Sequence, residues 1–183
     1  MDRRQRKTRE AIYQAFTTLL SHMSYEKITV GDIIALADIG RTTFYSHFET
    51  KDDLLDQLCA DIFGHVFGMP GTDEKTHDFS DSADISSRIT HIFYHLRDSG
   101  PVIKSLLAGE SGELFLRYIK KYLRDIFEDY RDIRTFGIPR DYIIDHMTSD
   151  FAETLRWWMK NDGYTPEQIS RFYLTTTPFL ETE

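Results

Sequence analysis

Apolar residues recur every three or four positions along most of the chain, which is the spacing of an amphipathic helix. The first stripe of this kind lies within residues 8–23 and consists of Ile12, Phe16, Leu19, Leu20 and Met23. No segment shows a convincing alternation of apolar and polar residues, which is the pattern of a half-buried strand. The pattern therefore predicts an all-α protein.

Capping residues, glycine and proline set the ends of the other predicted helices. Thr29, with an aspartate three residues later, forms a variant of the capping box, and Gly40 and Thr50 begin the next two helices. Thr165 caps the last helix, with Pro166 at the first helical position. About nine helices are expected, and those after the first span residues 30–37, 41–48, 51–67, 85–98, 101–107, 113–136, 140–160 and 166–180.

Residues 68–84, reading GMPGTDEKTHDFSDSAD, interrupt the helical pattern. They are rich in Gly, Ser, Thr and Asp, a composition that is typical of a mobile connector. The connector separates a small N-terminal head from a larger helical body. We place the two domains at residues 1–58 and 59–183.

Charge is distributed unevenly along the 183 residues. The formal net charge of −8 disfavours nucleic acid as a partner at first sight. However, residues 1–27 carry six basic and three acidic residues, whereas residues 59–183 carry 14 basic and 21 acidic residues. This asymmetry fits a DNA-reading head on an acidic body, although the basic N-terminus taken alone also fits a solvated tail.

Several features of the sequence bear on where in the cell the protein is located. No apolar run approaches the ~18 residues that a membrane-spanning helix needs. The N-terminus, MDRRQRKTRE, is not followed by the apolar stretch of a secretory signal. The single cysteine, Cys59, lies in an apolar helical run and is predicted to be a buried core residue. We expect a cytoplasmic protein with no membrane partner.

Residues 31–55, reading GDIIALADIGRTTFYSHFETKDDLL, carry the strongest functional signal. Two short helical patterns joined by a tight turn predict a helix-turn-helix. The second helix offers groups that bond base edges or phosphates, whereas Phe44 and Phe48 lie four apart and should pack inward. The residues predicted to contact double-stranded DNA are Thr29, Arg41, Thr42, Thr43, Tyr45, His47 and Lys51, with Arg4 and Lys7 in the basic N-terminus.

This segment resembles the TetR family of bacterial transcriptional regulators. The resemblance is strong over residues 8–58, where the first helix ends before YEKITVGDI and ALADIGRTTFYSHFETKDDLL follows. In that family the pattern TFY-x-HF-x-x-K-x-x-LL spans the recognition helix and the start of the next helix. The likeness implies that Thr43, Tyr45 and His47 contact DNA. It also implies that Lys51 clamps a phosphate and that Thr29 caps its helix and touches the DNA backbone.

The turn departs from the family pattern. It usually carries Gly and then Ser, whereas this chain has Asp38 and Gly40. The loss of a capping hydroxyl removes a possible phosphate contact. Because aspartate tolerates turn conformations, we expect the fold to be retained.

The resemblance further implies a body that forms a homodimer, usually through its last two long helices. The sequence supports this independently, because these segments carry more apolar surface than one small domain needs. A monomer that buries this surface internally is the alternative. The predicted interface residues are Met147, Phe151, Leu155, Trp158, Ile169, Phe172 and Tyr173.

An effector pocket in the body is also implied by the resemblance. Its predicted lining consists of Phe93, Tyr94, His95, Tyr118, Tyr122 and Trp157. The ending FAETLRWWMKNDGYTPEQISRFY resembles a short-bodied subgroup related to activators of dihydroxyacetone kinase operons. The effector is therefore a small molecule or, if that placement holds, a protein.

Other chemistry is weaker in the sequence. His91 and His95 have the spacing of a two-histidine metal site, but no third ligand is evident near them, and we predict no metal and no cofactor. No Gly-rich phosphate loop or nucleophile elbow is present, so an enzyme is not expected. The predicted function is a TetR-like regulator that binds a pseudo-palindromic operator as a dimer under effector control. The alternative is a helical protein-interaction adaptor whose head does not bind DNA.

Overall fold

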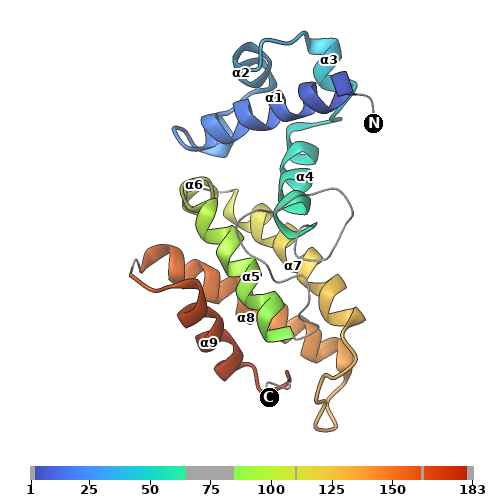
Figure 1. Ribbon diagram of the computed structural model, residues 1–183, viewed down its shortest axis with the longest axis vertical. Coiled ribbons are helices and arrows are strands. Elements are labelled where there is room, and N and C mark those ends of the chain that lie inside the picture. Colours follow the sequence, from blue (N-terminus) through green and yellow to red (C-terminus); the bar gives the residue numbers. More distant parts are fainter. Residues whose placement is uncertain (1–2, 65–84, 110, 162, 181–183) are drawn as a thin grey trace. The chain divides into compact units, whose positions relative to one another are not determined.

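The computed structural model describes residues 3–64, 85–109, 111–161 and 163–180. Regular structure within these residues is helical, apart from an isolated bridge between Ile133 and Leu180 (Figure 1). The all-α prediction with about nine helices is confirmed. The connector predicted at residues 68–84 lies outside the described residues.

The helices follow the predicted order, with a short 3-10 turn, η1, between the first two. Their bounds are α1 Arg3–Leu20, η1 Tyr25–Lys27, α2 Val30–Leu36, α3 Arg41–Tyr45, α4 Lys51–Gly64, α5 Ile85–Asp98, α6 Gly100–Ala108, α7 Gly112–Asp129, α8 Arg140–Lys160 and α9 Pro166–Thr176.

The chain divides into two compact units. Unit 1 comprises Met1–Cys59 and Pro101–Phe115, and unit 2 comprises Ala60–Gly100 and Leu116–Glu183. Most of α6 and the first turn of α7 therefore cluster with the helix-turn-helix, although the 41 residues 60–100 lie between the two parts of unit 1. The helical periodicity carries no sign of this association.

Unit 1 is built on a fully buried apolar core drawn from α1, α2, α4 and the recognition segment. Its side chains include Ile12, Phe16, Leu20, Ile33, Phe44, Leu54 and Leu55. The predicted cap of α2 is confirmed, because the Thr29 side chain and Asp32 exchange both capping-box hydrogen bonds. Thr50 accepts from the backbone N–H of Asp53 at the start of α4, as expected. Cys59 is buried, which confirms the prediction for the single cysteine.

Unit 2 has its core where α5 and α8 meet α9. The rings of Phe93 and Phe151 stack with centroids 4.7 Å apart. The buried Tyr173 hydroxyl donates to the carbonyl of Met147 at 3.2 Å, so its polar atom is satisfied inside the core. Thr165 and Pro166 begin α9 with a capping box, as predicted.

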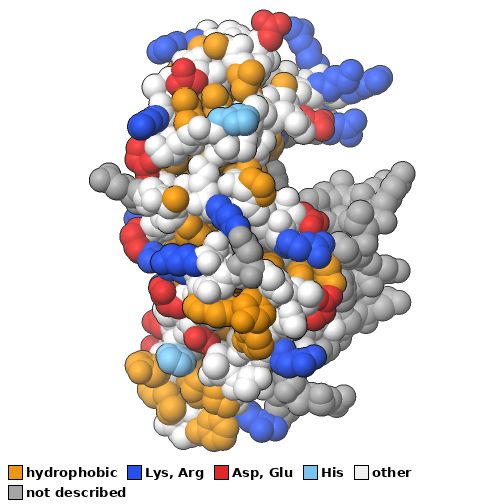
Figure 2. All heavy atoms as spheres, turned by 90° about the vertical axis from the view of Figure 1, so that its left-hand side faces the viewer, with side chains coloured by type: hydrophobic (Ala, Val, Ile, Leu, Met, Phe, Trp, Pro, Cys, Tyr) orange, Lys and Arg blue, Asp and Glu red, His pale blue; other side chains and the backbone are white. Residues whose placement is uncertain are grey.

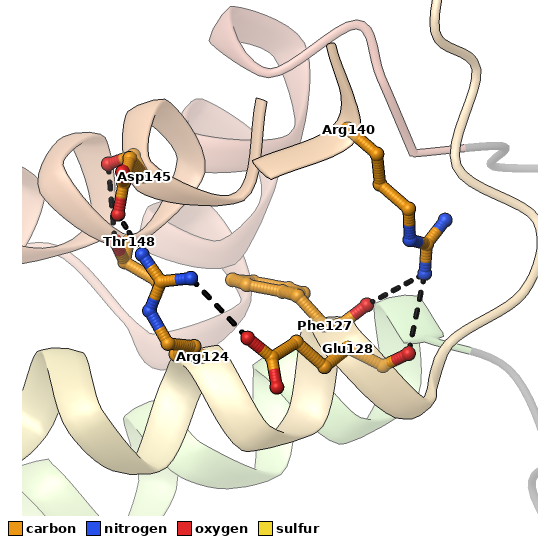
Figure 3. Close-up of polar contacts among 6 residues, drawn as sticks. All are labelled: Arg124, Phe127, Glu128, Arg140, Asp145 and Thr148. Carbon is orange, nitrogen blue, oxygen red and sulfur yellow. Dashed lines mark hydrogen bonds and ion pairs between the residues drawn. The ribbon is translucent and has the colours of Figure 1, made fainter. Parts of the chain in front are cut away.

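The long helix α7 ends at Asp129, seven residues before its predicted end. Beyond it, Ile133 forms an antiparallel bridge with Leu180, and Phe136 adopts a φ of +49°. Figure 3 shows the Arg140 guanidinium donating to the carbonyls of Phe127 and Glu128, at 3.0 and 3.3 Å. These bonds satisfy carbonyls that the end of a helix leaves exposed. The last helix likewise stops early, at Thr176 instead of about residue 180.

Candidate nucleic-acid interface

The recognition helix α3 presents the predicted polar residues on one side and its apolar residues on the other. Arg41, Thr42 and Tyr45 are exposed, whereas Thr43 and His47 are half-buried. Phe44 is fully buried and Phe48 is 1% exposed, so the inward packing of this pair is confirmed. Side chains able to bond base edges and phosphates are therefore available at the surface.

Packing against the buried rings of Phe44 and Phe48 fixes the direction of these side chains. The Tyr45 ring meets the Phe44 ring edge to face, with 5.4 Å between centroids. This contact holds the Tyr45 side chain in place although it is 49% exposed. Phe48 packs against Tyr13 of α1 at 5.6 Å, and the Arg9 guanidinium lies 5.6 Å from the Phe48 ring. Together these contacts attach the five-residue helix to α1.

The turn before α3 uses a left-handed residue. Asp38 has a φ of +53°, so the position where the family usually places glycine keeps the glycine-type conformation. Gly40 is the N-cap of α3 with no side-chain hydrogen bond, as the missing hydroxyl predicts. The departure in sequence thus leaves the backbone of the turn intact.

Replacement of Asp38 tests this conformation. Asp38→Val places a β-branched side chain in the left-handed region and is expected to lower the free energy of unfolding by about 1–2 kcal/mol. Asp38→Gly is the matched control and should change it by less than about 0.5 kcal/mol. Chemical denaturation of the three proteins measures both effects. Equal stability of the valine variant and the unchanged protein would contradict the assigned turn.

The Thr29 side chain makes its hydrogen bonds within the first turn of α2. Its hydroxyl donates to Asp32 at 2.7 Å and accepts from the Asp32 backbone N–H at 3.1 Å. Hydrogen bonds from the Thr29 hydroxyl and backbone lower the pKa of the Asp32 carboxyl. The hydroxyl hydrogen thus points to a carboxylate, and a fixed negative charge lies at the start of α2. The capping role implied by the resemblance is confirmed, whereas a phosphate would have to displace Asp32 to receive this hydrogen.

Lys51 is also engaged within unit 1. Its ammonium donates to the carbonyls of Tyr25 and Ile28, each at 2.8 Å, and lies 4.0 Å from the centroid of the Tyr25 ring. The lysine head thus contacts the turn before α2 in the protein without DNA, and its role as a phosphate clamp stays a prediction.

The basic residues of α1 are exposed. Arg3, Arg4, Arg6 and Lys7 lie in its first turns, and all four side chains are open to solvent. Figure 2 shows Lys and Arg side chains gathered around unit 1, at the top of the view. The predicted phosphate contacts Arg4 and Lys7 are thus available to an anionic partner.

The predicted dimer residues are mostly inside unit 2. Six of the seven are at most 5% exposed, and only Phe172, at 41%, reaches solvent. The six buried residues are Met147, Phe151, Leu155, Trp158, Ile169 and Tyr173. Because these side chains already fill the core of their own chain, they cannot also face a partner, and this prediction is corrected.

The exposed aromatic residues of α8 and α9 are different ones. Trp157 is 44% exposed, Tyr164 39% and Phe172 41%. Their ring centroids lie 5.2 to 6.4 Å apart, so they form one cluster, which we call the aromatic triad. Figure 2 shows hydrophobic side chains gathered in the lower half of the view, over the region of α8 and α9.

The predicted pocket residues do not share one environment. Phe93 is fully buried in the core, whereas Trp157 belongs to the exposed triad. Tyr94, His95, Tyr118 and Tyr122 are half-buried, and Tyr94 donates a hydrogen bond to Glu167. These residues therefore differ in exposure, and the lining as a whole stays a prediction.

Two further features bear on other functions. The Nε2 atoms of His91 and His95 lie 2.9 Å apart, yet within the described ranges no group of three or more metal-ligating side chains occurs. No helix among the described residues is long and apolar enough to span a bilayer.

Two contacts within unit 1 join segments that lie far apart in the sequence. The Glu26 carboxylate accepts the backbone N–H of Ser111, and a Cβ added to Gly109 would lie 2.9 Å from both of its oxygens. The Ser105 hydroxyl donates to the carbonyl of Met23 at 3.3 Å. These bonds attach the segment between α1 and α2 to α6 and to the turn that joins α6 to α7. Because they link residues more than 80 positions apart, helical periodicity carries no sign of them.

Curated relatives match part of the chain. The regulator YxbF of Bacillus subtilis (strain 168), described as HTH-type, is 39% identical over 71 residues, or 36% of this chain. DhaS, the dhaKLM operon activator of Lactococcus lactis subsp. lactis (strain IL1403), is 34% identical over 59 residues, or 32% of this chain. These matches cover only 19% and 32% of the lengths of the two relatives.

Solved structures match nearly the whole chain. A TetR transcriptional regulator from Streptococcus agalactiae 2603V is 36% identical, with 96% of each chain covered and a TM-score of 0.68. The dihydroxyacetone kinase operon activator DhaS superposes with a TM-score of 0.62 over 96% of this chain and 98% of its own. Its 20% identity shows a shared fold alone.

Family models cover both parts of the chain. The model described as bacterial regulatory proteins, tetR family, matches residues 12–58. The model described as transcriptional regulator C-terminal region matches residues 84–177, which is more than half of the chain. Family members are transcriptional regulators and not enzymes, which agrees with the expectation from sequence. With its helix-turn-helix and its all-α architecture, this chain belongs to the TetR family of bacterial transcriptional regulators.

Proposed function

We propose that the protein binds a pseudo-palindromic DNA operator as a homodimer and that an effector acting on its C-terminal part controls this binding. The observation that carries the proposal is the surface of α3, where Arg41, Thr42 and Tyr45 are exposed. Beneath them lie the buried side chains of Phe44 and Phe48. Each subunit inserts this surface into the major groove. The two recognition helices then lie about 34–36 Å apart, one turn of B-DNA.

Exposed cations on α1 support the DNA-binding step. Arg4 and Lys7 supply phosphate contacts, while Thr43 and His47 lie beside the base-reading residues. Phosphate contacts of this kind release counterions, so log affinity falls linearly with log salt. A protein that binds its target DNA in the cell shares the compartment of that DNA, and we therefore place its action in the cytoplasm.

The aromatic triad supports the homodimer. Trp157, Tyr164 and Phe172 are packed against one another but remain between 39% and 44% exposed. Clustered Trp, Tyr and Phe side chains are typical of the centre of an interface. In a twofold-symmetric dimer the same patch meets its own copy, so one triad per subunit suffices.

The contact of Glu26 with Ser111 supports a route for effector control. Most of α6 and the first turn of α7 cluster with unit 1, whereas the rest of α7 belongs to unit 2. An effector that favours one arrangement of α7 thereby biases the turn before α2, and operator occupancy changes by population shift. The effector is a small molecule or a protein. Its proposed contact surface includes the half-buried Tyr94, His95, Tyr118 and Tyr122.

Hydrogen exchange tests the Glu26 contact. Glu26→Ala removes the acceptor, and Gly109→Ala adds a Cβ that displaces the carboxylate, so each is expected to reduce protection of the Ser111 amide. The double variant should exchange no faster than either single variant, because all three lose the same bond. Glu10→Ala, on exposed α1, is the control and should leave protection unchanged. Strictly additive effects would contradict the shared contact.

The same bond has a defined pH dependence. Hydrogen bonds from its own backbone N–H and, after an opposing effect of burial, from Ser111 lower the pKa of Glu26 below its ordinary value of 4.5. A depressed carboxyl pKa stabilises the folded state above the ordinary value, and this contribution is lost as pH falls through the folded pKa. Protection of Ser111 should therefore be constant near neutral pH and decline below about pH 4.5.

DNA binding itself is tested by fluorescence anisotropy with a duplex covering the region upstream of the coding sequence. We expect tight binding that weakens steeply as salt rises. The adaptor alternative predicts no binding, or weak binding that is insensitive to salt. Either of those outcomes would remove DNA recognition from the account and leave the family assignment in place.

A further inference from the structure

Lys51 joins the two ends of the helix-turn-helix. It is the first residue of α4, directly after the segment that contains α3. Its ammonium donates to the carbonyl of Ile28, the residue before the N-cap of α2, and to that of Tyr25. One side chain thus connects the residue that precedes the motif to the residue that follows it.

The ammonium of Lys51 makes three contacts within unit 1. Two of its three N–H donors reach carbonyl oxygens at 2.8 Å, and its charge lies 4.0 Å from the Tyr25 ring centroid, a cation–π distance. Burial lowers the pKa of Lys51, although the carboxylates of Asp52 and Glu26 oppose this effect. The lysine is therefore held in place and partly desolvated without DNA.

A second bond reinforces the first. The Tyr25 hydroxyl donates to the carboxylate of Asp52, the residue after the lysine. The Tyr25 side chain is thereby fixed against the first turn of α4, and its ring remains under the ammonium. We call Tyr25, Lys51 and Asp52 the closing triad.

We propose that Lys51 is a positioning residue for DNA recognition, closing the helix-turn-helix with Tyr25 and Asp52 rather than binding a phosphate. This inference rests on the proposed DNA binding but is separate from it. A helix as short as α3 does not hold its own conformation in water, so its orientation depends on packing and on ties at both ends of the motif. The closing triad supplies such a tie across 23 residues of chain.

Salt dependence distinguishes positioning from phosphate contact. Lys51→Met is expected to weaken binding of the upstream duplex by roughly 10- to 100-fold while the slope of log affinity against log salt stays unchanged. Lys7→Met, in exposed α1, is the matched variant. It should make the slope shallower by about 0.9, the value for one lost phosphate contact. A decrease of that size in the Lys51 variant would overturn the inference.

Asp52 gives a test that does not depend on the lysine variant folding. Asp52→Ala removes a negative charge close to the DNA-binding residues, which by electrostatics alone should strengthen binding to phosphate. Positioning predicts the opposite, because the Tyr25 side chain loses its anchor. Glu49→Ala removes another exposed carboxylate in the same region and should leave binding unchanged or tighter. Tighter binding by the Asp52 variant would overturn the inference.

The outcomes separate the two claims. If the unchanged protein fails to bind any duplex, the proposed function itself fails and this inference with it. If it binds, and Lys51→Met lowers the salt slope or Asp52→Ala tightens binding, only the closing role fails. Circular dichroism melting of each variant confirms that the fold is retained during the titrations.

Discussion

Replacement of Arg41 and Tyr45 by alanine together is expected to weaken operator binding by at least about 30-fold. Arg41 is exposed at the start of α3, and Tyr45 is 49% exposed one turn later. A base or phosphate contact from each side chain contributes about 1–3 kcal/mol to affinity or discrimination, and the two losses add. Fluorescence anisotropy with a labelled operator duplex at fixed salt measures the change.

Two controls accompany this variant. Thr18→Ala alters an exposed residue of α1 whose hydroxyl donates to the carbonyl of Gln14 in the same helix. This variant should leave the affinity for DNA unchanged. Because neither replaced side chain is buried, the melting temperature should also remain close to that of the unchanged protein. Full affinity in the double variant would remove the surface of α3 from DNA recognition.

Replacement of Trp157 and Phe172 by alanine is expected to convert the proposed homodimer to a monomer. Truncating an aromatic side chain at the centre of an interface costs about 2 kcal/mol or more. Each change occurs twice in a twofold-symmetric dimer, so the dissociation constant should rise by at least ~1,000-fold. Sedimentation velocity at micromolar protein measures the resulting mass.

Phe136→Ala is the control for this experiment. Phe136 is 68% exposed, more than any member of the aromatic triad, but it lies in the loop between α7 and α8. If exposure alone drove association, this variant would dissociate as well. A triad variant that remains dimeric would show that subunits meet elsewhere, and loss of dimers should also reduce operator affinity because only one half-site is then held.

Local sequence signals predicted much of the head. The aspartate three positions after Thr29 and the proline directly after Thr165 predict both threonines as helix caps, and both make capping hydrogen bonds. Phe44 and Phe48 are buried as their spacing predicts. These features depend on neighbours within one or two helical turns, which is the range over which a sequence pattern carries structural information.

The rotation of α8 about its axis could not be predicted in the same way. Its apolar residues occupy more than one face, so Trp157 and Trp158 look equivalent in the sequence. The structure buries Trp158, whose indole N–H donates to the carbonyl of Tyr164, and exposes Trp157. The Trp158 ring packs edge to face on Phe93 of α5, whereas Trp157 lies beside Phe172 of α9. Such tertiary contacts decide which face is buried, and six of the seven predicted interface residues are core residues.

Contacts between segments that are distant in the sequence could not be predicted either. The amphipathic pattern of α7 continues past Asp129, but the chain leaves the helix and Ile133 pairs with Leu180. Lys51 reads as an exposed cation, and only its tertiary environment shows that it bonds Tyr25 and Ile28. In each case the partner lies more than 20 residues away, and the sequence of the segment itself does not change.

Selection from a pool of random duplexes, followed by sequencing, tests the central claim most directly. A dimer that reads DNA through two copies of α3 should enrich a pseudo-palindrome whose half-site centres lie about 10–10.5 base pairs apart, or a multiple of that distance. The Arg41/Tyr45 double alanine variant should enrich no such sequence. Failure of the unchanged protein to enrich any sequence, or enrichment of a single unpaired site, would contradict the account.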